Sequence, residues 1–289
     1  MAENLDDFVA GWVSGVAGLM LTQPIDYVLV RLQSGRASAP LAQAAPAEAA
    51  GGLRGLIGMW RGIGPLVATL PVNNAMLMYG YGVGKSFSKE EGSSLMPVFL
   101  GGCVGGFVQS FLQSPVELIK TRMQLAAISE VPSTTSLVMQ LGSFKTLTAG
   151  LNATLVRDVV PHGVWFSAYE WSKNTLERRE RTAAGLDATT KSAATEVPLS
   201  TASQLAAGSF AAFAAWVVGY PGDLLKTRCQ MVGGPASISD AARVVYAEGG
   251  IAAFYSGLGL KLLRAVPMSA VGFFAYEHTM VLLAKRHER

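Results

Sequence analysis

The chain has 289 residues, of which 50% are hydrophobic and only 15% are charged. Soluble domains usually carry about 25% charged residues, so this composition favours a protein whose helices lie in a membrane. A net charge of +3 is too small for a nucleic-acid-binding protein, and two cysteines are too few for a disulfide framework or a metal site, so neither nucleic acid nor a metal ion is expected as a partner.

Six long helices are predicted in chain order, several of them containing apolar runs rich in glycine and alanine. They cover residues 5–34, 64–87, 94–125, 153–177, 200–231 and 258–284. Residues 36–51 are rich in alanine and proline and are predicted to form a loop, and residues 178–199 a polar linker. The amphipathic stretch 237–250 is typical of a short surface helix.

Ionisable residues occur inside these helices at helical spacing. At membrane depth such residues are tolerated when they face the interior of a bundle or a watery cavity, and they are then often functional. The predicted fold class is therefore an all-α membrane protein whose helices surround a polar interior. The residues on which this prediction depends are Asp26, Glu117, Arg157, Asp223 and Arg264.

An internal repeat is the strongest pattern in the sequence. Three segments, Pro24–Gln33, Pro115–Gln124 and Pro221–Gln230, each have an acid two residues after proline, a basic residue seven after it and a glutamine nine after it. Each is followed by a second half in which a glycine precedes a proline by nine to eleven residues. The pattern predicts three units, residues 1–92, 93–184 and 185–289.

This threefold pattern resembles the signature of the mitochondrial carrier family. The resemblance implies a monomeric bundle of six transmembrane helices in three pseudo-symmetric repeats around a central cavity, with short helices on the matrix side. It also implies a multi-pass location in the inner mitochondrial membrane, bound membrane lipid such as cardiolipin, and antiport of a small solute by alternating access. No P-loop or catalytic triad pattern is present, so neither an enzyme nor a cofactor is expected. The acidic N-terminal segment has no basic leader, so no cleaved presequence is expected.

In this family the signature acids and bases form a ring of ion pairs that closes the matrix side. By position, Asp26 should pair with Lys120 and Glu117 with Lys226. Asp223 should pair with the residue five after Pro24, which is Leu29, so one of the three ion pairs is expected to be missing. The residues that match this matrix gate are Asp26, Glu117, Lys120, Asp223 and Lys226, with Gln33, Gln124 and Gln230 as bracing glutamines.

A second gate of the family lies on the cytoplasmic side of the even helices. Here the first copy lacks its acid and the third copy lacks its base, so this gate is expected to be the weaker of the two. The residues that match it are Lys85, Glu170, Lys173 and Glu277.

The family contacts its substrate halfway along the even helices, at positions that match Ala68, Arg157–Asp158 and Arg264. A cation beside an anion suits a zwitterion, because the arginines can bind a carboxylate and Asp158 an ammonium group. Trp216 lies five residues before Pro221, where its ring could hold a substituted ammonium group. The alternatives are that Arg157 and Asp158 form an internal ion pair that recognises nothing, and that Trp216 only packs.

The Arg-Asp pair and this tryptophan most resemble the carnitine/acylcarnitine branch, although Gln23 stands where that branch tends to have histidine. Two alternatives remain open. One is a carrier of basic amino acids, a branch that often adds an acid on the second helix, where this chain has none. The other is a carrier-fold scaffold that has lost transport. The lack of a cation at position 29, which is leucine, and the incomplete cytoplasmic gate would favour this alternative.

Overall fold

A computed structural model gives the fold, and helices account for all of its regular structure in the described residues. These residues are 2–33, 58–60, 62–86, 94–125, 133–141, 151–183, 199–231 and 237–287. The helices are α1 (Ala2–Gln33), α5 (Ile63–Ser86), α6 (Met96–Leu125), α7 (Thr134–Leu141), α9 (Leu151–Ala183), α10 (Thr201–Gln230), α11 (Ile238–Ala253) and α12 (Leu258–His287).

The six long helices predicted from the sequence are confirmed, and most of their ends agree within three residues. The prediction of a polar linker over 178–199 is wrong at its start, because α9 continues to Ala183. The residues of this extension include arginine and glutamate, which are good helix formers even where no apolar face is buried. The loop predicted over 36–51 and the rest of that linker, up to residue 198, lie outside the described residues.

Three stretches of the described chain are long and apolar enough to cross a membrane: Asp6–Gln33, Met96–Gln124 and Ala202–Gln230. Each ends in one of the three signature segments, and each contains its proline, Pro24, Pro115 or Pro221, inside the helix. The first half of each repeat is therefore one long helix that changes from an apolar to a charged segment at the proline.

The chain divides into two compact units, and four of the long helices contribute residues to both. The first unit comprises residues 1–75, 110–154 and 220–289, and the second comprises residues 76–109 and 155–219. The first contains the charged ends of the signature helices, and the second contains the glycine-rich part of α6 and most of α9.

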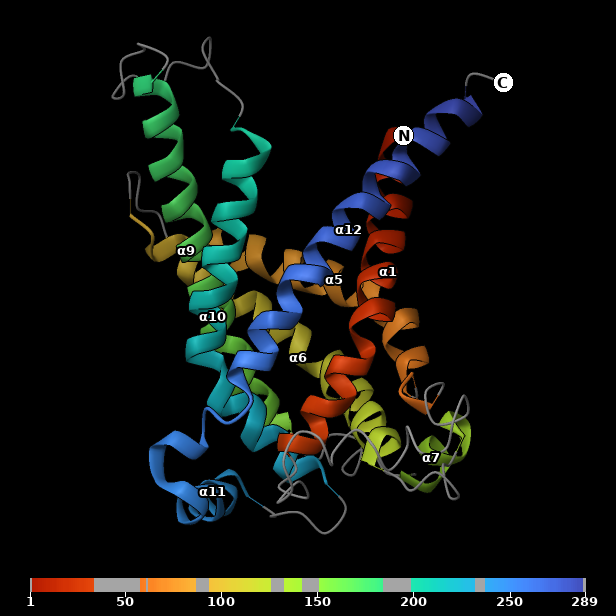
Figure 1. The fold of residues 1–289 in the computed structure, drawn as a ribbon, viewed down its shortest axis with the longest axis vertical. Helices are drawn as coiled ribbons and strands as arrows, with labels where there is room; N and C mark the ends of the chain where they lie inside the picture. The colour runs from red at the N-terminus through yellow and green to blue at the C-terminus, as the bar shows by residue number, and fades with distance from the viewer. Residues whose placement is uncertain are drawn as a thin grey trace. The chain divides into compact units, whose positions relative to one another are not determined.

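In the first unit, α1 and α12 pack along each other in opposite directions (Figure 1, red and blue). Three contacts fix their register: Tyr276 Oη donates to Asp7 Oδ1 at 2.9 Å, Ser14 Oγ donates to the Gly272 carbonyl at 2.7 Å, and Gly18 faces Met268. The outer ends of the two helices, near the marks N and C in Figure 1, lie at the same end of this pair.

Two short helices cover the charged ends of the signature helices in the same unit. Buried leucines of α10 pack against Ala241 and Val245 of α11, and Leu118 and Ile119 of α6 pack against Leu137 of α7. The helix predicted over 237–250 is thus confirmed as α11, which begins after the N-cap residue Ser237, whose hydroxyl accepts the amide N–H of Asp240.

In the second unit, α6 contacts two neighbouring helices through glycines. Gly101 and Gly105 face α5, where a Cβ atom added at Gly80 would lie 2.7 Å from the Gly105 Cα atom. Gly102 and Gly106 face α9, and a Cβ atom added at Gly106 would lie 2.4 Å from the Asp158 carbonyl oxygen. Small residues at this spacing let membrane helices approach backbone to backbone.

Replacing Gly105 with valine is therefore expected to lower the thermal stability of the protein sharply. A Cβ atom there would lie 2.6 Å from the Leu77 carbonyl oxygen, so α5 and α6 would have to separate. Overpacking of this kind costs about 1–3 kcal/mol or more. Gly82→Ala on α5 is the matched control, because a Cβ atom there meets nothing within 4 Å. Equal unfolding temperatures for both variants in detergent would contradict the packing described.

Candidate functional site

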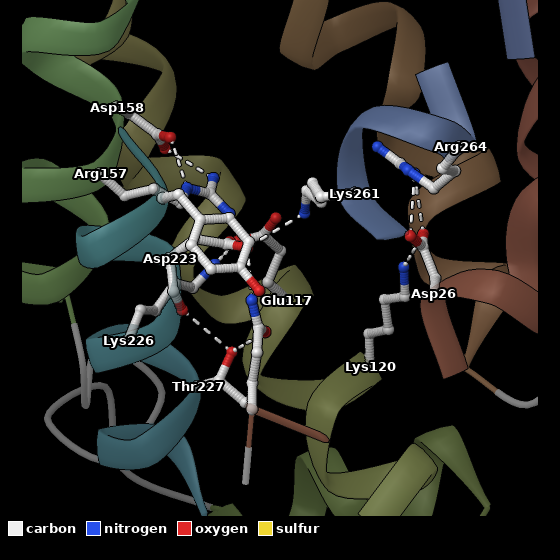
Figure 2. Close-up of polar contacts among 12 residues, drawn as sticks. Asp26, Glu117, Lys120, Arg157, Asp158, Asp223, Lys226, Thr227, Lys261 and Arg264 are labelled. Carbon is white, nitrogen blue, oxygen red and sulfur yellow. Dashed lines mark hydrogen bonds and ion pairs between the residues drawn. The ribbon is translucent and has the colours of Figure 1, made fainter. Parts of the chain in front are cut away.

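The three signature segments bring their acids into one ion-pair cluster within the first unit (Figure 2). Each acid contacts at least one cation contributed by a different helix. The cluster consists of the carboxylates of Asp26, Glu117 and Asp223 and the cations of Lys120, Lys226, Lys261 and Arg264.

Asp26 of α1 binds two cations at once. Lys120 Nζ of α6 lies 3.0 Å from Asp26 Oδ2, as the repeat predicts. Arg264 Nη1 of α12 lies 2.9 Å from Oδ1 and 3.0 Å from Oδ2 of the same carboxylate. Figure 2 shows Asp26 between these two cations. The Asp26–Lys120 contact is confirmed, and Arg264, predicted only as a substrate contact, also belongs to the ion-pair cluster.

Glu117 of α6 pairs with Lys226 of α10, and this predicted contact is also confirmed. The Lys226 side chain is only 4% exposed, so its charge depends on the carboxylate for compensation. Gln113 Nε2, one turn earlier on α6, donates to Glu117 Oε1 at 3.0 Å, and Asn73 of α5 donates to the Gln113 amide oxygen at 3.1 Å.

The expectation that Asp223 lacks a cation is wrong. Lys261 Nζ of α12 lies 3.0 Å from Asp223 Oδ2, and the Gln33 side-chain amide of α1 donates to the same oxygen at 3.0 Å. Leu29 itself is buried, with 2% of its surface exposed. The expectation failed because it compared only equivalent positions of the repeats, and Lys261 lies outside the signature. Lys261 is also the one residue of the ion-pair cluster that the sequence analysis missed.

The three glutamines that end the signature segments are all buried but differ in their contacts. Gln33 donates to Asp223 and accepts the Thr227 hydroxyl at 2.9 Å. Gln230 accepts the Thr121 hydroxyl at 3.4 Å. Neither amide atom of Gln124 has a hydrogen-bond partner within the described part of the chain. Direct contact with a cluster carboxylate is therefore seen for Gln33, and bracing by the other two stays a prediction.

Arg157 and Asp158 of α9, in the second unit, bind each other. Arg157 donates from Nε to Asp158 Oδ1 at 2.6 Å and from Nη2 to Oδ2 at 2.8 Å. Arg157 is 8% and Asp158 is 3% exposed, and His162 Nδ1 lies 2.6 Å from the Asp158 carbonyl oxygen. A ligand that uses either charge would have to replace its bidentate partner. Of the other predicted contacts, Trp216 is half-buried and Ala68 is exposed.

The residues that match the cytoplasmic gate make their described contacts within their own helices. Lys173 Nζ lies 3.7 Å from Glu177 Oε1, Asn174 donates to Glu170 at 3.4 Å, and Lys85 lies over the Tyr81 ring. In the described chain no ion pair joins Lys85, Glu170 or Lys173 to another helix. The side chain of Glu277 lies outside the described part.

The fold and the ion-pair cluster describe a helical membrane protein with three repeats. The sequence profile of the mitochondrial carrier protein family matches residues 2–92, 91–180 and 197–287. The chain belongs to the mitochondrial carrier family.

Three curated relatives cover nearly the whole chain. It is 29% identical to the mitochondrial carnitine carrier of Saccharomyces cerevisiae, over 98% of this chain and 89% of the relative. It is 32% identical to the mitochondrial arginine transporter BAC2 of Arabidopsis thaliana, over 94% of this chain and 89% of the relative. It is 28% identical to human solute carrier family 25 member 45, over 96% of this chain and 98% of the relative.

Proposed function

We propose that this protein is a carrier of the inner mitochondrial membrane that exchanges a zwitterionic solute, with one carboxylate and a cationic nitrogen, by alternating access. The observation that carries the proposal is the composition of the ion-pair cluster, which contains three carboxylates and four cations. Lys120, Lys226 and Lys261 suffice to pair the three acids. Arg264 is the surplus cation, so a substrate carboxylate can bind it while Asp26 keeps Lys120.

The cationic end of the substrate is assigned to the second charged pair. Asp158 is the acid that can accept an ammonium or guanidinium group, and Arg157 can bind a carboxylate. Their mutual ion pair keeps both charges compensated without substrate, and a zwitterion that displaces it offers an opposite charge to each group. Trp216 adds an aromatic face suited to a quaternary nitrogen.

Two substrate types fit this chemistry. One relative is named as a carnitine carrier and another as an arginine transporter, and both of these solutes combine a carboxylate with a cationic nitrogen. We place the carnitine or acylcarnitine type first, and a basic amino acid is the alternative. One argument for a non-transporting scaffold no longer holds, because Lys261 supplies the cation that was expected to be missing opposite Asp223.

The ion-pair cluster is assigned as the matrix gate. Its pairs join α1 to α6, α6 to α10 and α10 to α12, so the signature ends of α1, α6 and α10 are tied together and α12 is held to them. Ion pairs suit a gate because attraction is largely offset by desolvation, so each pair contributes little net free energy and substrate binding can shift the balance between two states. The few contacts of Lys85, Glu170 and Lys173 support a weaker cytoplasmic gate.

Uptake into proteoliposomes tests the proposed function. The purified carrier is offered carnitine, acylcarnitines, arginine, lysine and their methylated forms, with ADP and malate as controls that lack the expected cationic nitrogen beside a single carboxylate. Saturable exchange of one zwitterion is expected. A preference for trimethylated over primary amines would support a role for Trp216. Exchange of a nucleotide or a dicarboxylate alone would overturn the assignment of Asp158, and no exchange of any solute would favour the scaffold.

The double variant Arg157→Gln/Asp158→Asn is expected to fold but to lose most uptake. Removing both partners of a buried ion pair is often nearly neutral for stability, whereas Asp158→Asn alone leaves Arg157 uncompensated. Loss of a charge contact with substrate costs about 2–5 kcal/mol, or roughly thirtyfold to several thousandfold in uptake. Normal uptake by the folded double variant would mean that the two residues form an internal pair that recognises nothing.

A further inference from the structure

We propose that Lys261 takes the part of the cation that the repeat lacks at position 29, so that the third ion pair of the gate joins α10 to α12 instead of α10 to α1. The proposal rests on the proposed function only in naming the cluster a gate. It assigns to Lys261 the role of a gate cation, which the repeat pattern does not predict.

Asp223 has a charged partner on one helix and a neutral hydrogen-bond donor on another. Lys261 of α12 supplies the charge, with Nζ 3.0 Å from Oδ2 and with side chains 11% and 7% exposed. Gln33 of α1, four residues after Leu29, supplies a neutral amide donor to the same oxygen. Helix α1 therefore still reaches Asp223 one turn beyond position 29, but it contributes a hydrogen bond and no charge.

Leu29 helps to put Lys261 in place. The turn before α12 passes directly over it: a Cβ atom added at Gly257 would lie 3.1 Å from Leu29 Cδ1 and 2.6 Å from Tyr220 Oη. Tyr220 Oη donates to the Ser256 carbonyl at 2.6 Å and holds the turn. Gly257 has φ +93°, which favours glycine, and its carbonyl accepts the amide of Lys261 at the start of the helix.

The apolar residue at position 29 and the cation at position 261 are thus linked through the turn at Gly257. Leu29 is buried beneath the turn, and one helical turn later the chain presents Lys261 to Asp223. The replacement supplies the cation from α12 instead of α1, to the same carboxylate oxygen that Gln33 of α1 contacts.

The replacement also joins the gate to the proposed substrate contact. Lys261 and Arg264 are three residues apart on α12 and therefore lie on neighbouring positions of one helix face. Lys261 binds Asp223 of α10, and Arg264 binds Asp26 of α1 (Figure 2). A substrate carboxylate that takes Arg264 from Asp26 would act on the same helical turn that holds the third gate pair.

A double-mutant cycle in the substrate-free carrier tests the pair. The unfolding temperature in detergent is measured for Lys261→Met, Asp223→Asn and the double variant. Each single variant should unfold about 5–10 °C lower, because a buried charge loses its partner, and the double variant should lose clearly less than the two combined. Lys261→Arg should retain most of the stability. Arg243→Met, an exposed cation on α11, is the matched control and should change little.

Moving the cation tests whether Lys261 replaces a residue at position 29. Leu29→Lys is introduced beside Lys261→Leu and compared with Leu29→Met in the same background. Recovery of at least half of the lost unfolding temperature by lysine, and not by methionine, is expected, since a packing role of Lys261 could not be restored from another helix. Additive losses in the cycle would overturn the pair. Coupling without recovery would overturn the replacement.

These measurements need no substrate, so they remain decisive whatever solute the carrier exchanges. If the cycle shows coupling while the uptake panel shows no exchange, the pair stands and the proposed function fails. If the panel shows exchange of a zwitterion while the cycle is additive, the proposed function stands and the role of Lys261 fails.

Discussion

Arg264→Ala is expected to reduce zwitterion uptake by at least about thirtyfold while leaving the carrier folded, because the loss of a charge contact with substrate costs about 2–5 kcal/mol. Folding should survive because Asp26 keeps Lys120, whose ammonium lies 3.0 Å from its carboxylate. Arg264→Lys should retain part of the uptake, since it keeps the charge but not the paired N–H donors of the guanidinium group. The measurements are initial uptake rate and unfolding temperature.

The control for this variant is Arg243→Ala, which removes an exposed arginine from α11. It should leave uptake and unfolding temperature close to those of the unchanged carrier. Normal uptake by Arg264→Ala would show that no substrate group uses this arginine. A large fall in its unfolding temperature would show that Asp26 needs both cations, and the surplus-cation argument would then be wrong.

Lys226→Met is expected to destabilise the protein by about 3–5 kcal/mol, the usual effect of removing one partner of a buried ion pair. The side chains of Lys226 and Glu117 are 4% and 15% exposed, so water can compensate the remaining carboxylate only in part. Thermal unfolding in detergent measures the loss. Of the cluster variants described, this one should affect stability most.

The double variant Lys226→Met/Glu117→Gln separates a lost ion pair from lost packing. Gln113 can still donate to an amide oxygen at position 117, and no buried charge remains. Most of the stability should return, because replacing both partners of a buried pair is often neutral. A double variant as unstable as Lys226→Met alone would mean that the lysine side chain acts through its packing.

The helical fold followed from patterns that depend on local sequence. A threefold repeat of apolar runs ending in the same charged segment is visible without any tertiary information, and the long helices begin and end close to the predicted residues. The error at 178–183 has a local cause as well. A charged segment was interpreted as a linker, although arginine and glutamate propagate a helix that is already formed.

The ion-pair cluster could be predicted only where the repeats are equivalent. Asp26–Lys120 and Glu117–Lys226 follow from comparing the same positions in successive repeats, and both contacts are present. The partner of Asp223 breaks the repeat and comes from α12. One signal was available in the sequence. Lys261 precedes Arg264 by three residues, so both cations lie on one face of the otherwise apolar first turns of α12.

The glycines of α6 have a consequence for movement. Helices that meet through interlocked side chains can slide only if those side chains change rotamer, whereas a contact between backbones presents a smooth surface. Gly101 and Gly105 toward α5, and Gly102 and Gly106 toward α9, give α6 such surfaces on two sides. Shear between packed helices requires small translations of this kind. A shift of α6 along its neighbours would therefore need no side chain at these four positions to change rotamer, whereas any larger residue there would force the helices apart.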